Sequence, residues 1–178
     1  MIPLFDLFLL VFTGLAVGFD VRERRIPNRL VLIGIVAGIL FNGSAGKSQL
    51  FDSVLGLGLG LGILLLPFAF GWLGAGDVKF FGAVGALLGV KFVPRVFFYS
   101  ALLGGVLAVI SIAFRGMNLR IFRTVWWDLK VLVASRGAVL PESVGKQSRG
   151  DTLPYGVAIG LGTLAAFYLD PLGEWAGF

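Results

Sequence analysis

The residues with the clearest chemical potential are two aspartates far apart in the chain, Asp20 and Asp77. Asp77 lies in the glycine-flanked stretch 71–79, between two long apolar runs. A carboxylate so close to hydrocarbon costs several kcal/mol if unpaired, so an acid at this position is a candidate functional group. Gly74 and Gly76 lack a Cβ, which would let backbone or substrate approach closely and permit dihedral angles that other residues avoid. The alternative is a glycine-containing loop with one solvated acid.

The composition limits the chemistry available to such a site. The 178-residue chain contains no cysteine and no histidine, so thiolate nucleophiles, imidazole bases and the usual ligands of transition metals are absent. We therefore expect chemistry based on carboxylates, hydroxyls, Lys or Arg, without a metal or other cofactor. Because 57% of the residues are hydrophobic and only 14% are charged, the sequence predicts an integral membrane protein rather than a soluble domain.

Apolar runs predict an all-α fold with six transmembrane helices in a single domain, residues 1–178. An amphipathic stretch that contains two tryptophans predicts a further helix lying in the membrane interface, at 118–134. Since no signal-peptide cleavage site follows the first run, we expect it to be retained as a helix. The six predicted spans are 2–19, 30–42, 50–70, 80–90, 96–114 and 153–169.

The basic residues predict the orientation of these helices. All but three of the 15 Lys and Arg residues fall on one membrane face, the exceptions being Lys47, Lys91 and Arg95. The basic face is predicted to be cytoplasmic, with loops at about 20–29, 71–79 and 115–152 and with both termini outside. The net charge of +5 is thus explained by cytoplasmic loops, and we expect the lipid bilayer rather than nucleic acid as a partner. Because two helices separate Asp20 from Asp77, both acids should reach the same face.

Two carboxylates at one level of a helix bundle permit hydrolysis. An ionised acid can deprotonate a water while a protonated acid polarises the scissile carbonyl, and two acids a few Å apart share one proton because they cannot both ionise easily. This is the arrangement of an aspartic protease. The alternative is that Asp20 and Asp77 are interfacial charges, neutralised by Arg22 and Lys79.

Three segments resemble motifs of the type IV prepilin peptidase family. FDVRERRIPNRL at 19–30 resembles the first-aspartate segment, in which basic residues and Ile-Pro-Asn follow the acid. GAGDVKFFG at 74–82 resembles the Gly-x-Gly-Asp segment, and LPYGVAIG at 153–160 is similar to the start of the carboxy-terminal helix. A single Gly-x-Gly-Asp is a weak signal, whereas three segments in this order are a specific one.

The resemblance implies an intramembrane aspartyl endopeptidase of the inner (cytoplasmic) membrane. Such an enzyme removes the basic leader peptide from type IV pilin-like or archaellin-like precursors, with its active site facing the cytoplasm. Asp20 and Asp77 would be the catalytic acids, and the resemblance does not assign which is the base. Six further residues would shape the site or contact substrate: Gly74, Gly76, Lys79, Asn28, Pro154 and Tyr155.

Bifunctional members of the family carry a domain with paired Cys-x-x-Cys motifs that is associated with N-methylation. Because this chain lacks cysteine, we expect a short form that cleaves without methyl transfer. One alternative is a protease similar to signal peptide peptidase, whose first acid follows a tyrosine where this chain has Phe19. The other is a small transporter that binds a cation at the two acids, which Lys79 and the nearby arginines disfavour.

Overall fold

The computed structural model describes residues 4–115, 126–127, 130–131, 134 and 155–169, and this part of the chain contains helices and no strands. The predicted all-α fold is therefore confirmed. Most of the predicted interfacial helix, 118–134, lies outside the described residues. The bounded helices are α1 (Leu4–Glu23), α2 (Asn28–Ala45), α3 (Lys47–Ala69), α4 (Ala75–Leu88), α5 (Phe92–Arg115) and α7 (Tyr155–Tyr168).

Four of these helices are long and apolar enough to cross a membrane: α1, α2, α3 and residues Phe92–Ser111 of α5. The other two, α4 and α7, have 14 residues each, which is fewer than the roughly 20 that a bilayer requires.

Helix boundaries differ from the predicted ones near both acids. α1 continues to Glu23 and α4 begins at Ala75, so Asp20 and Asp77 are helical residues and the predicted loops 20–29 and 71–79 are only partly loops. The predicted turn between the second and third helices shrinks to Gly46. The prediction was wrong here because it ended helices at the first charged residues. Charges are tolerated in a terminal helical turn, whereas glycines with positive φ end α2 and α4, at Gly46 and Gly89.

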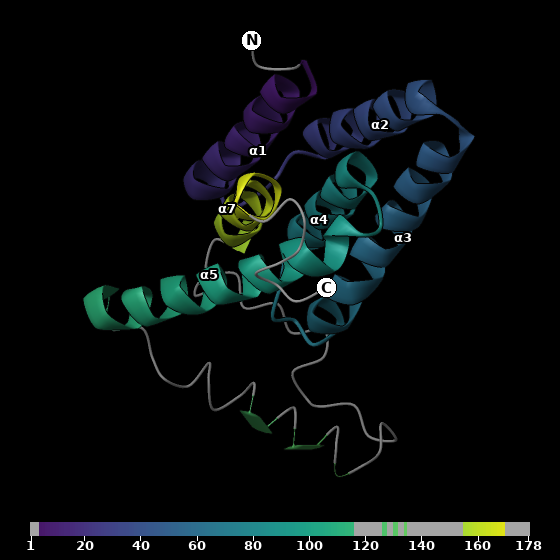
Figure 1. Cartoon of the computed structure of the whole chain (residues 1–178). Helices are drawn as coiled ribbons and strands as arrows, with labels where there is room; N and C mark the ends of the chain where they lie inside the picture. Colours follow the sequence, from purple (N-terminus) through teal and green to yellow (C-terminus); the bar gives the residue numbers. More distant parts are fainter. Residues whose placement is uncertain (1–3, 116–125, 128–129, 132–133, 135–154, 170–178) are drawn as a thin grey trace.

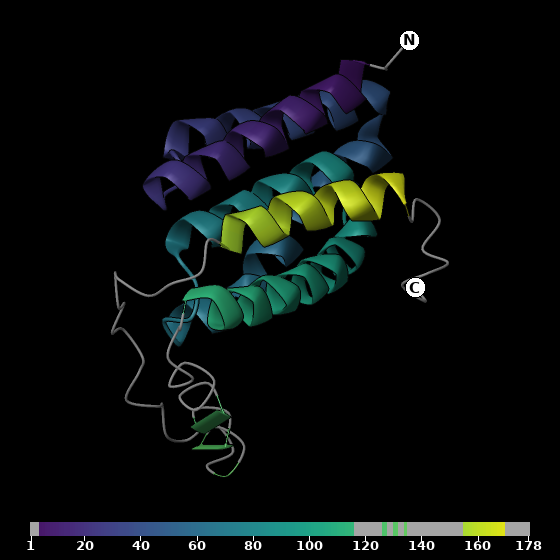
Figure 2. The ribbon, with the colours of Figure 1, turned by 90° about the vertical axis from the view of Figure 1, so that its left-hand side faces the viewer.

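Two short helices occupy the middle of the bundle. α4 packs mainly against α3 and α2, while α7 packs mainly against α5 and α1. Figure 1 shows α7 between α1 and α5, and Figure 2 shows the same order from the side. Because α4 and α7 also contact each other, α7 connects α1, which carries Asp20, to α4, which carries Asp77.

Glycines allow α3 and α4 to approach each other closely. A Cβ on Gly56 would collide with the carbonyl oxygen of Gly85, and a Cβ on Gly60 would lie 2.9 Å from the carbonyl oxygen of Phe81. In contrast, Gly58 and Gly62 have no neighbouring atom within 4 Å of such a Cβ. Gly56 and Gly60 therefore form the small-residue pair of α3 that contacts α4, whereas Gly58 and Gly62 do not.

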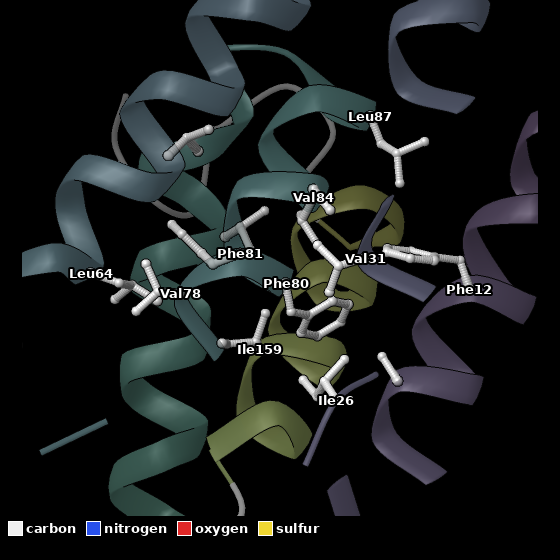
Figure 3. Close-up of a cluster of buried hydrophobic side chains, with 14 of the residues drawn as sticks. Phe12, Ile26, Val31, Leu64, Val78, Phe80, Phe81, Val84, Leu87 and Ile159 are labelled. Carbon is white, nitrogen blue, oxygen red and sulfur yellow. The ribbon is translucent and has the colours of Figure 1, made fainter. Parts of the chain in front are cut away.

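Phe80 anchors α4 within the hydrophobic core. Its side chain is completely buried, and its ring centroid lies 5.6 Å from that of Phe12 in α1. Figure 3 shows Phe80 among Ile26, Val31 and Ile159, which come from the α1–α2 link, α2 and α7. The core therefore fixes the first half of α4, which carries Asp77, against the elements near Asp20.

The opposite end of the bundle is closed by aromatic and polar contacts. Phe5 and Phe167 have ring centroids 6.0 Å apart, which joins the start of α1 to the end of α7. Asn42 Nδ2 donates to the carbonyl oxygens of Ala86 and Leu87 at 3.2 and 3.1 Å. These bonds satisfy carbonyls at the end of α4 that have no partner within the helix.

Candidate active site

Both acids lie at the same end of the bundle. Asp20 is in the last turn of α1, Asp77 is in the first turn of α4, and the negative charge of Asp20 acts on the Asp77 carboxyl. The first turn of α7 reaches the same place, since Gly156 packs against the Asp20 carboxylate. The α1–α2 link closes this end, because Ile26 packs against Gly76. Three helix ends and one link thus form the candidate site.

Asp20 is a buried acid with an unused acceptor. Its side chain is only 5% exposed, and its Oδ2 has no hydrogen-bond partner among the described residues. The backbone N–H groups of Gly156 and Val157 face this carboxylate, and the charge of Arg24 lies nearby. An unsatisfied buried carboxylate oxygen is costly, which makes it a natural position for a bound water or for a proton donor.

Asp77 caps its own helix. Its Oδ2 accepts a hydrogen bond from the backbone N–H of Gly74 at 3.1 Å. Asp77 lies outside the four helices that are long enough to cross a membrane. Burial, and then the negative charge of Asp20, raise the pKa of Asp77 to about 7. An acid with such a pKa can keep its proton near neutral pH beside a neighbouring negative charge.

Tyr155 lies beside Asp77 at the first residue of α7. Burial, together with the negative charge of Asp77, raises the pKa of the Tyr155 phenol. The ring also packs on α5, because a Cβ on Gly104 would lie 2.9 Å from Tyr155 Cε2. Tyr155 is therefore a neutral hydroxyl near the acids. Pro154 lies outside the described residues.

The glycines before Asp77 have ordinary backbone conformations. Gly74 has φ −80° and ψ 150°, and Gly76 is helical, while Gly71 is the glycine of this stretch with a positive φ, at 74°. The expectation of unusual dihedral angles at Gly74 and Gly76 is therefore wrong. A Cβ on Gly76 would lie 3.5 Å from the backbone nitrogen of Ile26, so this side of Gly76 faces the protein itself.

Lys79 does not neutralise Asp77. Its Nζ donates a hydrogen bond to Asn28 Oδ1 at 3.1 Å, which links α4 to the first residue of α2. The structure therefore does not contain the alternative arrangement, in which Asp77 is an interfacial charge paired with Lys79. In the described part of the chain, no cluster of three or more Asp or Glu residues could hold a metal ion.

Sequence reasoning missed Ile26 as a residue of this site. It expected the segment 154–156 to pack beside the two acids, but it did not predict that Gly156 itself contacts Asp20. Gly156 begins a series with Gly160 and Gly162 along α7, and this spacing signals close helix contacts. This spacing did not show that the first glycine of the series, Gly156, lies next to Asp20. No sequence signal distinguishes Ile26 from the other apolar residues that follow a basic segment.

Comparison with known proteins places this chain among membrane peptidases. The model of the type IV leader peptidase family matches residues 7–109, which include both acids. A prepilin leader peptidase/N-methyltransferase from Pectobacterium carotovorum subsp. carotovorum is 34% identical over 118 residues, which are 62% of this chain and 40% of that protein. A protein of the same description from Neisseria gonorrhoeae is 32% identical over 124 residues, which are 66% of this chain and 43% of that protein.

The chain therefore spans about two fifths of the length of these curated relatives. No solved structure matches it significantly. The family resemblance is confirmed, because the family model covers more than half of the sequence. Segments 19–30 and 74–82 lie within the matched residues, whereas segment 153–160 lies outside them. This chain belongs to the type IV leader peptidase family.

Proposed function

We propose that this chain is an intramembrane aspartyl endopeptidase that removes the basic leader from type IV pilin-like or archaellin-like precursors. Asp20 and Asp77 are its catalytic acids. The observation that carries the proposal is that two aspartates 57 positions apart lie close enough for the charge of Asp20 to help raise the pKa of Asp77 to about 7. Family membership supports the same conclusion.

The reaction needs one ionised and one protonated carboxyl group. The ionised acid takes a proton from water as the water oxygen bonds to the peptide carbonyl carbon, while the protonated acid gives its proton to the carbonyl oxygen. The resulting diol collapses, the C–N bond breaks, and the new amine takes up a proton from the dyad.

Cleavage takes place at the cytoplasmic face of the inner membrane, in a multi-pass protein with both termini outside. This placement is supported by the basic residues that surround the site, including Arg22, Arg25 and Arg29, because basic loops are usually cytoplasmic. A precursor's leader would remain on this side while its apolar helix stays in the bilayer. Cutting at the interface requires less unwinding of the substrate helix than cutting at mid-bilayer.

The product is not N-methylated by this chain. Support comes from the lack of cysteine, since the family's methyl-transfer function is associated with a Cys-x-x-Cys domain. Gly74 and Gly76 allow the substrate backbone to approach Asp77 along the side not covered by Ile26, and Pro154 helps to shape the entry to α7. Tyr155 and Asn28 border the bound substrate.

Three variants test the proposal by co-expression with a pilin-like precursor and mass measurement of the precursor's amino terminus. Asp20→Asn and Asp77→Asn should each abolish cleavage, because the amide can neither accept nor deliver the proton. Asp52→Asn is the matched control, since Asp52 lies at the other end of the bundle, near Gly89. It should cleave like the unmodified chain. Cleavage retained by either dyad variant would falsify the dyad, and the same mass measurement reports methylation.

A further inference from the structure

The Asp20 carboxylate lies directly against the backbone of α7. A Cβ on Gly156 would lie 2.7 Å from Asp20 Oδ2, 2.9 Å from its Cγ and 3.1 Å from its Cβ. The first two distances are shorter than real Cβ atoms show and the third is tighter than most, so the carboxylate can keep this place only if residue 156 has no side chain. The acid itself is almost completely buried and cannot simply turn into solvent.

The neighbouring turn of α7 supplies a natural comparison. Gly160 faces the same helix, α1, and a Cβ there would collide with the side chain of Val17. Gly156 and Gly160 thus serve the same helix contact one turn apart. Only Gly156 meets a group with a chemical role.

The first turn of a helix is also favourable for a carboxylate. Its N–H groups have no partner within the helix, and the helix dipole places partial positive charge there. The N–H groups of Gly156 and Val157 face Asp20, while Asp20 Oδ2 keeps no partner among the residues the structure describes. The turn therefore holds the carboxylate from one side, with Asp20 Oδ2 as the atom that lies nearest to Gly156.

We propose that Gly156 is a positioning residue for Asp20. By bringing the backbone of α7 against the carboxylate, it fixes the position and orientation of the Asp20 side chain relative to the attacking water. This inference rests on the proposed peptidase function. It assigns a role to a residue that touches neither substrate nor water, and it explains why a glycine is needed at the start of α7.

The first test compares Gly156→Ala with Gly160→Ala in a cleavage assay. Gly156→Ala should lower kcat by at least about tenfold with little change in KM, because a displaced base impairs the chemical step more than substrate binding. It should also shift the pH profile of kcat, since the electrostatic surroundings of Asp20 change. Gly160→Ala should stay within about threefold of the unmodified chain, with the same pH profile. Equal losses in the two variants, with unshifted profiles, would reduce Gly156 to a packing residue.

The second test does not depend on activity. The melting temperature of the purified protein in detergent is measured for Gly156→Ala and Gly160→Ala, each with Asp20 and with Asp20→Ala. With Asp20 present, Gly156→Ala should lower Tm by on the order of 5 °C, and most of this loss should disappear in the Asp20→Ala background. The effect of Gly160→Ala should be the same in both backgrounds. An undiminished Gly156→Ala effect would overturn the inference.

The peptidase function and the positioning role of Gly156 can fail separately in these tests. If Asp20→Asn still cleaves the precursor, the peptidase proposal fails whatever the Gly156 variant does. If Asp20→Asn is inactive but Gly156→Ala behaves like Gly160→Ala in both tests, the peptidase proposal stands and the role of Gly156 is rejected.

Discussion

Lys79 Nζ and Asn28 Oδ1 form a hydrogen bond of 3.1 Å that joins two helix beginnings at the end of the bundle that contains both acids. Lys79 lies two residues after Asp77, and Asn28 is the first residue of α2, eight residues after Asp20. The bond therefore links the segments that follow the two acids. It ties the first turn of α4 to the chain that leaves α1.

We expect this link to matter for catalysis more than for stability. Lys79→Met and Asn28→Ala should each lower the cleavage rate about tenfold, because small displacements of a catalytic group are costly. Each should change the free energy of unfolding by no more than about 1 kcal/mol, since the bond is exposed. The double variant should lose no more than the worse single variant. Lys91→Met, which removes an exposed lysine at the opposite end, is the control. Additive losses would indicate that the two residues act separately.

The cleavage rate should fall at alkaline pH. Since burial and the charge of Asp20 raise the pKa of Asp77 to about 7, the dyad loses its shared proton above this pH, whichever acid carries it. The rate constant should then fall by about tenfold for each pH unit well above 7. Cleavage assays between pH 6 and 9 measure this, with Tm recorded at each pH to verify folding. A rate that is constant up to pH 9 would contradict a dyad with this pKa.

The same pKa predicts how stability depends on pH. An acid whose pKa is higher in the folded state than its ordinary value of 3.8 binds its proton more tightly when folded. Its contribution is therefore most favourable below about pH 4, declines as pH rises to about 7, and is constant above that. Asp77→Asn removes this titration while keeping an oxygen acceptor for the Gly74 N–H.

The test compares the free energy of unfolding of Asp77→Asn with that of the unmodified chain. The value for the variant minus the value for the unmodified chain should increase between pH 5 and pH 8, by at most about 3 kcal/mol. Denaturation in detergent at the two pH values gives the difference directly. Asp52→Asn serves as the control and should show a smaller change over this interval. A difference that stays constant from pH 5 to pH 8 would show that Asp77 is already ionised in the folded protein at pH 5.

Two glycines of α3 should respond differently to the same substitution. Gly56→Ala places a methyl group against the backbone of Gly85, which cannot move aside as a side chain can, and should cost about 1–3 kcal/mol. Gly58→Ala meets no atom within 4 Å and should be neutral or stabilising by up to about 1 kcal/mol, because alanine favours helix more than glycine does. Thermal unfolding in detergent compares them. Equal effects would mean that α3 is turned differently in the folded protein.

Much of the architecture was predictable because it depends on local properties of the chain. Long apolar runs predict helices whatever their neighbours, so the all-helical fold could be predicted from residue types alone. The boundaries were harder. Charged residues near 20 and 77 suggested loops, but α1 continues through Asp20 and ends only at Glu23, before Arg24, whose φ is 50°.

What the sequence by itself determined is the helical class of this protein, its family and the two acids that the family motifs single out. Only the tertiary structure decided that Gly156 supports Asp20, that Lys79 bonds to Asn28 rather than to Asp77, and that Gly56 rather than Gly58 faces α4. The physical reason is distance along the chain. Helical periodicity is a property of near neighbours, whereas each of these contacts joins residues dozens of positions apart and depends on how whole helices are rotated and packed.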